Sequence, residues 1–238
     1  MERYNILRKN IEEMGFDYVH EVYAEEEIER MLSVITSVDS TSQVFRRTTD
    51  LFAIRQCLKE IPELTGLVLN QKLKNVIFKV FGSDYFVVKS IYFDKPGTSN
   101  WFVSYHQDLT ISVDNKKEIE GFGPWTVKQD KYAVQPPKYI LDNIFTVRIH
   151  LDETNEKNGA LHVIPASHLK DIRRYNEMNK EAEVICHVPK GGIMIMKPLL
   201  WHSSKRSSEN KTRRVIHIEF SNKELPSGIS WSEKQAIE

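Results

Sequence analysis

The chain has only two cysteines, Cys57 and Cys186, which are too few and too far apart in sequence to suggest a disulfide framework. This scarcity fits a reducing compartment, and we expect each thiol to be a small buried side chain. There is no run of eighteen consecutive apolar residues, so the sequence contains no typical transmembrane helix. The N-terminus opens as a charged segment without the apolar region of a signal peptide, and we expect a cytoplasmic protein.

An excess of either charge is also absent, because 33 Lys and Arg residues balance 33 Asp and Glu residues. A balanced chain lacks the basic surface with which proteins bind nucleic acids or anionic membranes. We therefore expect a small molecule as partner. No internal repeat or low-complexity tract occurs, and 238 residues with 40% hydrophobic content can bury the core of a single domain.

Residues 1–82 show mainly helical periodicity. Helices are predicted over residues 4–14, 24–38, 51–58 and 64–81, with a short strand over 16–22 and a polar loop over 37–50 that could border a site. Gly82 is expected to end the last helix. We expect these helices to pack on the outside of a sheet formed by the following residues.

From Tyr85 onward the sequence changes to β-branched residues and alternation, which are typical of strands. Strands are predicted over residues 85–94 and 101–108, joined by a turn at 95–97. Residues 109–142 are predicted to form a long irregular connection, and such connections are usually lids or binding loops. Our candidates for substrate contact in this connection are Trp125, Tyr132 and Gln135.

Two later strands, over residues 144–152 and 213–220, each have one polar and one apolar face. The polar faces are Thr146, Arg148, His150 and Asp152 in the first strand, and Arg213, Val215, His217 and Glu219 in the second. Ionisable groups on the inner face of a sheet need partners or a ligand, so we predict a cavity there. His150 and His217 could ligate a metal ion, but hydrogen-bonded residues of the cavity wall are the favoured interpretation.

His106 and Asp108 form a His-x-Asp pair at the end of a predicted strand. Side chains two residues apart in a strand point the same way, so both can reach one metal ion. His202 would complete a set of two histidines and one carboxylate, the ligand set of non-haem Fe(II) oxygenases. A short motif of this kind arises often by chance, and its weight depends on the residues that follow His202.

Arg213 follows His202 by eleven residues, at the start of a predicted strand. An arginine can hold a carboxylate through two parallel hydrogen bonds, as an iron enzyme with a dicarboxylate co-substrate requires. The alternation places Arg213 inward and its neighbour Arg214 outward. Arg148 and Thr146, on a neighbouring inner face, are further candidates for contact with a co-substrate or substrate.

These motifs resemble the phytanoyl-CoA dioxygenase family of Fe(II)- and 2-oxoglutarate-dependent oxygenases. The resemblance rests on His106-x-Asp108, the segment Asn158-Gly159-Ala160-Leu161-His162-Val163-Ile164-Pro165-Ala166-Ser167-His168, His202 and Arg213. It extends from about residue 85 to residue 220, with Ala166 at a usual glycine position. It implies a mainly β double-stranded β-helix, a cupin-like jelly roll, with helices outside. The expected organisation is a helical part over 1–82, the β-helix core over 83–222 and a tail over 223–238.

The resemblance also implies that His106, Asp108 and His202 hold Fe(II) and that Arg213 binds the distant carboxylate of 2-oxoglutarate. The implied reaction uses O2, releases succinate and CO2, and hydroxylates a small-molecule substrate; halogenating relatives have a small residue in place of the carboxylate, so Asp108 favours hydroxylation. Two other classes stay open, a cupin-type metalloenzyme that does not use 2-oxoglutarate and a non-catalytic small-molecule-binding barrel. The triad together with Arg213 favours an enzyme, because a binding module has no chemical need for the whole set.

Overall fold

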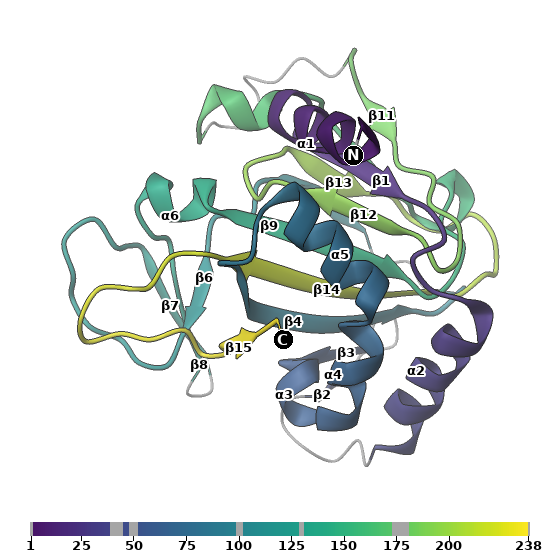
Figure 1. Cartoon of the computed structure of the whole chain (residues 1–238), viewed down its shortest axis with the longest axis horizontal. Coiled ribbons are helices and arrows are strands. Elements are labelled where there is room, and N and C mark those ends of the chain that lie inside the picture. The colour runs from purple at the N-terminus through teal and green to yellow at the C-terminus, as the bar shows by residue number, and fades with distance from the viewer. Residues whose placement is uncertain are drawn as a thin grey trace.

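The computed structural model describes residues 2–38, 45–47, 52–98, 102–128, 131–172 and 181–237 (Figure 1). Its largest sheet, the large sheet, has eight strands in the order β1-β12-β9-β14-β4-β3-β2, with β15 paired to β4. The strands are β1 (Phe16–Val19), β2 (Phe45–Arg47), β3 (Phe52–Arg55), β4 (Phe86–Lys95), β9 (Ile144–His150), β12 (Ile193–Met196), β14 (Arg213–Ser221) and β15 (Gln235–Ala236). All the registered pairs in this sheet are antiparallel.

A second sheet, the small sheet, has the order β11-β10-β13-β5. Its strands are β5 (Val103–His106), β10 (Leu161–Val163), β11 (Val184–Ile185) and β13 (His202–Ser204). A buried apolar cluster joins the two sheets, because it contains Val163 of the small sheet and Met194 and Met196 of the large sheet. This pair of antiparallel sheets is the double-stranded β-helix that the sequence predicts, and the predicted fold class is confirmed.

The outer face of the large sheet is apolar and is covered by helices. These are α1 (Glu2–Glu13), α2 (Glu25–Ser37), α3 (Cys57–Glu60), α4 (Pro62–Val68) and α5 (Gln71–Val80), and α5 crosses the sheet in Figure 1. Phe145, Val147 and Ile149 of β9 are fully buried in one cluster with apolar residues of all five helices. Each such side chain contributes about 1.5–3 kcal/mol when it leaves water. The apolar half of the predicted alternation therefore forms the main core.

The inner face of the large sheet carries the polar half of the alternation. Cross-strand partners point to the same side of a sheet, and His217 of β14 lies opposite Arg148 of β9. Glu219 lies between Thr146 of β9 and Lys89 of β4. The strands therefore present their ionisable residues to the interior between the two sheets, as expected for a cavity wall.

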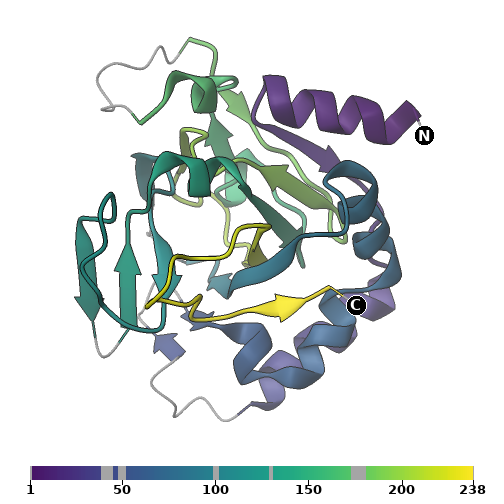
Figure 2. The ribbon, with the colours of Figure 1, turned by 60° about the vertical axis from the view of Figure 1, so that its left-hand side comes forward.

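The segment after β5 differs from its prediction. Instead of an irregular connection over 109–142, a third sheet is formed in the order β6-β8-β7, followed by the short helix α6 (Lys138–Asp142). The strands are β6 (Ile111–Val113), β7 (Trp125–Lys128) and β8 (Lys131–Val134), and Figure 2 shows them on the left beside the barrel. Each strand has only three or four residues, which is too short for a clear alternation. The glycines and prolines nearby favoured the prediction of an irregular connection.

Two helix predictions also need correction. Residues 51–58 were predicted as one helix, but Phe52–Arg55 form β3, which pairs with β4, and a helix begins only at Cys57. A short apolar run fits either structure, and pairing with an existing strand decides between them. The predicted helix over 64–81 is two helices, and the Asn70 side chain caps the second by accepting from the Leu73 amide.

Both ends of the described chain join the large sheet. β1 lies at one edge beside β12, and β15 pairs with β4 near the other. The part expected to be mainly helical thus adds three strands to the large sheet, β1, β2 and β3, and the expected tail adds β15. Most of the polar loop predicted over 37–50 lies outside the described residues, as does Trp101. In the described part of the chain, no helix is long and apolar enough to cross a membrane.

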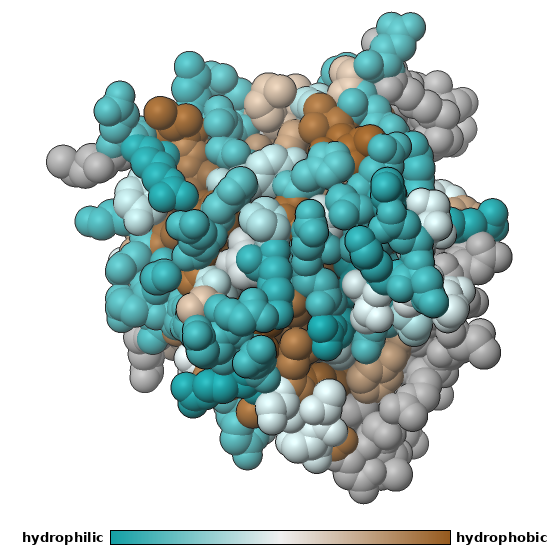
Figure 3. Space-filling model, turned by 90° about the vertical axis from the view of Figure 1, so that its right-hand side faces the viewer, coloured by the Kyte–Doolittle hydropathy of each residue, from teal (hydrophilic) through white to brown (hydrophobic). Residues whose placement is uncertain are grey.

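The remaining elements are two short 3-10 helices, η1 (Glu156–Asn158) and η2 (Ser167–Lys170). The latter follows Ala166, which has a left-handed backbone with φ of 59°. Only glycine adopts this conformation without a steric cost. Alanine at position 166, where the family usually has glycine, therefore keeps the turn but strains its backbone. On the face shown in Figure 3, the surface is mostly hydrophilic and its apolar atoms form separate groups.

Candidate active site

Three residues that the sequence predicts as metal ligands lie together between the sheets. His106 ends β5 and His202 begins β13, and the two are direct cross-strand partners. Asp108 follows β5 by two residues, and its carboxylate oxygens lie 3.7 Å from Nε2 of each histidine. One ligand atom from each residue lies within 4.8 Å of the others. The geometry therefore permits all three residues to contact one ion.

Backbone carbonyls orient both imidazole rings. Nδ1 of His106 lies 2.9 Å from the Ser104 carbonyl, and Nδ1 of His202 lies 2.8 Å from the Leu200 carbonyl. A carbonyl only accepts, so Nδ1 carries the proton in each ring and Nε2 keeps its lone pair. Asp108 is fixed by its own amide, which donates to the Pro198 carbonyl at 2.9 Å. Each side chain thus presents a free electron pair to the common point, as metal binding requires.

The charge states of Asp108 and His202 also suit a cation. Burial lowers the pKa of His202 to about 4, although Asp108 opposes the shift, so the imidazole is neutral at neutral pH. Burial acts to raise the pKa of Asp108, but His202, His217 and Lys89 outweigh it and bring it to about 2. An anionic carboxylate beside a neutral imidazole needs no deprotonation before it binds a metal.

Arg213 is a buried cation with unused donors. It begins β14, is 5% exposed, and its Nη2 lies 3.5 Å from Oγ of Ser204, while Nε and Nη1 have no hydrogen-bond partner in the described structure. Burial and then Arg148 lower its pKa to about 9. A buried guanidinium without a carboxylate partner is costly unless a ligand supplies one.

The neighbouring Arg214 is directed outward, as the alternation predicts, but its partner Asp152 does not follow the prediction of an inner position, because β9 ends at His150. Its Nε and Nη2 donate to the two carboxylate oxygens of Asp152 at 2.8 and 2.6 Å, so its charge is already satisfied. Of the two arginines considered for a carboxylate ligand, Arg213 therefore has the inward position and the unused donors.

Further unpaired polar atoms lie along the inner face of β9, the strand that pairs with β14. Oγ1 of Thr146, Nε of Arg148 and Nε2 of His150 are all buried without a hydrogen-bond partner in the described structure. The other nitrogen of His150 lies 2.7 Å from Oγ1 of Thr154. Buried polar groups are almost always paired, so a cluster of unpaired ones indicates a place for water or a polar ligand.

His217 and Glu219 form a second polar group close to Asp108, with ligand atoms within 4.8 Å of one another. His217 Nε2 lies 3.2 Å from Oε1 of Glu219, and the same oxygen lies 2.7 Å from Nζ of Lys89. Burial acts to lower the pKa of Lys89, but Glu219 and Asp108 outweigh it and raise the pKa, so the ammonium stays charged. The ordinary role of His217 as a hydrogen-bonded wall residue fits these contacts.

Three predicted substrate residues lie on or next to the third sheet. Trp125 and Tyr132 are partly buried and pack against its apolar cluster, which contains Val134. The backbone N–H of Gln135 donates to the Pro124 carbonyl at 3.3 Å. This packing gives Trp125 and Tyr132 a structural role, and contact with a substrate stays a prediction for all three.

Two residues near the site were missed by reasoning from sequence. Ser204 stands two residues after His202 in a strand, which was a usable sign that it faces the same way. Lys89 shares the inner face with Glu219, but its pairing depends on the register of β4 against β14, which no local pattern reveals.

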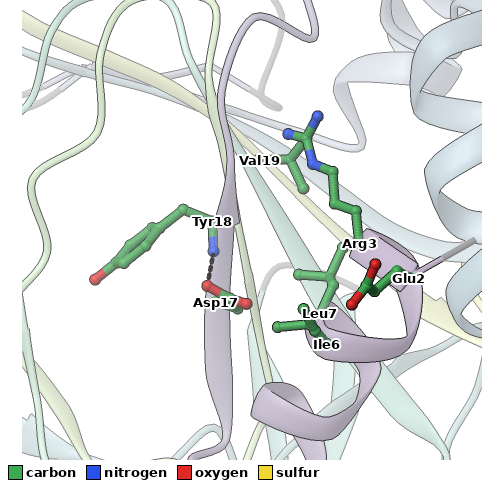
Figure 4. A pocket seen from close by; sticks show the side chains of 7 residues that line it. All are labelled: Glu2, Arg3, Ile6, Leu7, Asp17, Tyr18 and Val19. Atoms are coloured by element: carbon green, nitrogen blue, oxygen red, sulfur yellow. Dashed lines mark hydrogen bonds between the residues drawn. The ribbon is translucent and has the colours of Figure 1, made fainter.

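A surface hollow lies apart from these residues, between α1 and β1 (Figure 4). It is lined by residues such as Ile6, Leu7 and Asp17, and Figure 4 shows the Tyr18 ring directed to the opposite side of β1. A second hollow lies between α2 and α4. Neither contains a predicted site residue, so we place the candidate active site between the sheets.

The fold and the site define a class of protein. A double-stranded β-helix that brings two histidines and one carboxylate together is the arrangement of non-haem iron oxygenases. The family model described as phytanoyl-CoA dioxygenase (PhyH) matches residues 11–215. The chain belongs to this family. Comparison with curated proteins found no match.

Solved structures with the same fold span nearly the whole chain. AviO1 from Streptomyces viridochromogenes Tue57 has a TM-score of 0.68 at 16% identity, covering 94% of this chain and 96% of its own. The 2-oxoglutarate-dependent epimerase SnoN from nogalamycin biosynthesis has a TM-score of 0.69 at 14% identity, and the match covers 99% of this chain and 95% of SnoN. HygX from Streptomyces hygroscopicus, solved with nickel and 2-oxoglutarate, has a TM-score of 0.67 at 12% identity, covering 96% and 89%. At these identities the likeness shows a shared fold.

Proposed function

We propose that this protein is an Fe(II)- and 2-oxoglutarate-dependent dioxygenase that hydroxylates a small molecule with release of succinate and CO2. The observation that carries the proposal is the buried Arg213, with two unused donors, in the same interior as the triad. A metal site alone fits many enzymes. A metal site together with an unpaired inward arginine fits a co-substrate that is both a chelator and an anion.

The donor set fits Fe(II). His106, Asp108 and His202 would hold the ion on one side, through two imidazole nitrogens and one carboxylate oxygen. Such a facial set leaves the remaining positions open for a chelating ligand and dioxygen. A metal site built only for structure would instead be closed by protein ligands, as in four-coordinate zinc sites. The limited number of donors therefore supports a catalytic role.

The interior also fits 2-oxoglutarate. Arg213 would bind the distant carboxylate through its guanidinium N–H groups, because Nε and Nη1 have no partner in the described structure and Nη2 has only the 3.5 Å contact with Ser204. The Ser204 hydroxyl already donates to the Gly159 carbonyl at 2.9 Å, so it is held in place beside the guanidinium. Thr146 and Arg148 have unpaired atoms on the adjacent strand and would supply further donors.

When bound, Fe(II) and 2-oxoglutarate would supply the oxidising chemistry together with O2, which is reduced as the co-substrate is decarboxylated and the substrate is oxidised. The protein residues do the rest of the work by binding and orientation. The carbonyl contacts of His106 and His202 hold the rings in place, and Arg213 sets the direction of the co-substrate. The apolar cluster around Met194 and Met196 excludes water from one side of the interior.

Hydroxylation is the outcome we propose among several that this fold supports. The structural relatives include proteins described as an epimerase and a carbocyclase, so fold alone does not decide the outcome. Asp108 keeps a carboxylate at the third ligand position, which leaves no room there for a halide. Transfer of an oxygen atom to a substrate C–H bond is the simplest reaction of the resulting centre.

The test is turnover with isotopic oxygen. Purified protein is supplied with Fe(II), 2-oxoglutarate and 18O2, and succinate and CO2 are quantified. Even without the substrate, we expect slow conversion that requires iron and oxygen, with one labelled oxygen atom in succinate. Iron-dependent oxygen consumption without succinate would favour the cupin-type alternative, and the absence of metal binding would favour a binding protein.

A further inference from the structure

A polar row crosses three strands of the large sheet beside Asp108. Lys89 of β4 lies opposite Glu219 of β14, which in turn lies opposite Thr146 of β9. Direct cross-strand partners share one face, so all three side chains point into the interior between the sheets. Glu219 is 4% exposed and Thr146 is fully buried, while the Lys89 side chain is 21% exposed and marks the open end of the row.

Glu219 uses only one of its two oxygens. Nζ of Lys89 at 2.7 Å and Nε2 of His217 at 3.2 Å both contact Oε1. Within the described part of the chain both hydrogen bonds of the Glu219 carboxylate go to Oε1 and none goes to Oε2. The neighbouring Thr146 hydroxyl is buried without a partner. A carboxylate held on one side in this way presents a fixed acceptor on the other side.

This group does not suit a second metal ion, although Asp108, His217 and Glu219 are close enough to share one. Nη1 of Arg148 lies 3.2 Å from Nδ1 of His217, and an arginine only donates. Nδ1 is therefore the acceptor, and Nε2 carries the proton toward Glu219. Without a free lone pair on His217, and with Lys89 and Arg148 beside it, an added cation would be repelled.

The charges of the row select the kind of group that it can bind. Lys89 and Glu219 form a neutral pair, so the pair attracts neither free cations nor free anions strongly. An ammonium group at Oε2 would stand near Lys89, and a carboxylate at Lys89 would stand near Glu219. A hydroxyl group satisfies both partners, because its proton goes to Oε2 and its oxygen accepts from Nζ.

We propose that Glu219 and Lys89 together recognise a hydroxyl group of the prime substrate, which makes a hydroxylated small molecule the substrate class. The inference rests on the proposed function, since the row is next to Asp108 of the proposed iron centre. It assigns to Glu219 and Lys89 a role in specificity rather than in metal binding. A long acyl chain would leave Oε2 of Glu219 without a donor and would be disfavoured.

Binding of small probes tests this inference. Wild-type protein, Glu219→Gln and Lys89→Met are loaded anaerobically with Fe(II) and 2-oxoglutarate, and titrated by calorimetry with myo-inositol and methyl α-D-glucopyranoside. Cadaverine and octanoyl-CoA serve as the amine and acyl probes. The visible charge-transfer band of the iron complex is recorded in parallel, because it shows whether the iron centre is intact.

Glu183→Gln is the matched control. Glu183 also contacts one histidine and one lysine, with His162 at 2.8 Å and Lys205 at 3.4 Å. Leu161 and Val163 are the cross-strand partners of Ser204 and His202 and share their inner face. His162 lies between them in the strand, so His162 and its partner Glu183 lie on the outer face of the small sheet. The control therefore removes an equivalent charge without touching the interior.

We expect the hydroxylated probes to bind wild type and Glu183→Gln alike, and to bind Glu219→Gln and Lys89→Met about ten- to a hundredfold more weakly, as for loss of one charged hydrogen bond. The charge-transfer band should persist in every variant. Equal binding of these probes to all variants would overturn the inference, as would failure to bind wild type or preference for cadaverine or octanoyl-CoA. A missing band in wild type would refute the proposed function, while the calorimetry would still test Glu219.

Discussion

Replacement of Arg213 by methionine should affect 2-oxoglutarate in a way that no other substitution in the last strand does. Methionine replaces the aliphatic part of the arginine side chain and has no charge, so it keeps much of the packing at a position that is 5% exposed. The variant removes the guanidinium that would bind the distant carboxylate, including the unpaired donors Nε and Nη1. The carboxylate would then enter the interior without its counter-charge.

The expected size of the effect follows from the burial of the site. Loss of one partner of a buried charge pair costs about 3–5 kcal/mol, because the other charge stays unpaired. Each 1.4 kcal/mol is a factor of ten, so the dissociation constant of 2-oxoglutarate should rise by roughly two to three and a half factors of ten. The free protein should show the opposite effect. Burial already lowers the pKa of Arg213 to about 9, and removing this unpaired cation should stabilise the protein without ligand.

A ligand pair isolates the interaction with the distant carboxylate. 2-Oxobutyrate keeps the 2-oxo acid end of 2-oxoglutarate but lacks the second carboxylate. In wild type, 2-oxoglutarate should bind far more tightly than 2-oxobutyrate to the Fe(II) protein under anaerobic conditions. In Arg213→Met the difference between the two ligands should almost disappear, since each would bind through the metal end alone.

Arg214→Met is the control for this experiment, because Arg214 is adjacent in sequence and paired with Asp152 outside the cavity. It should leave the preference for 2-oxoglutarate unchanged. The reasoning is refuted if Arg213→Met keeps the full preference. If Arg214→Met loses it instead, the inward face of the last strand has been assigned to the wrong residues.

Three further predictions concern the ligands and the fold. Alanine at His106, Asp108 or His202 should each abolish tight Fe(II) binding while the circular dichroism spectrum stays unchanged; wild-type iron stoichiometry in one variant would remove that residue from the triad. In the metal-free protein the pKa of His202 is about 4, below its usual 6.5, so as the pH falls the unfolded chain takes up a proton before the folded chain does. The free energy of unfolding should therefore fall by about 2 kcal/mol from pH 7 to pH 5 in urea titrations. His202→Gln should flatten this dependence, and an equally steep curve in that variant would contradict it. Ala166→Gly should raise stability by about 1 kcal/mol by relieving the left-handed strain, whereas Ala160→Gly should lower it, and the reverse order would refute the strain argument.

The sequence predicted the barrel well because its strands show strong alternation. In β9 the apolar residues Phe145, Val147 and Ile149 alternate with Thr146 and Arg148, and this order alone gives the buried and the polar face. The family motifs then imply how the strands are connected. The third sheet was missed because strands of three or four residues between glycines and prolines show too little alternation.

The candidate site was predictable where it depends on local spacing. His106 and Asp108 are two residues apart, and their common direction follows from strand geometry. Their contact with His202 depends on pairing between β5 and β13, which lie almost a hundred residues apart in sequence, and only the resemblance to a family implied it. The pair of Lys89 and Glu219 had neither a local pattern nor a family motif, so the register of β4 against β14 was needed to reveal it.

The most direct test of the central claim is an anaerobic titration of the metal-free protein with Fe(II) and then 2-oxoglutarate, followed by visible absorption. We predict that Fe(II) alone gives no visible band, and that 2-oxoglutarate then produces the weak metal-to-ligand charge-transfer band of a chelated iron complex, at one equivalent of each. Loss of the band in His202→Ala would tie it to the proposed site. Iron binding without a band would contradict the role of 2-oxoglutarate, and failure to bind iron would contradict the proposed site itself.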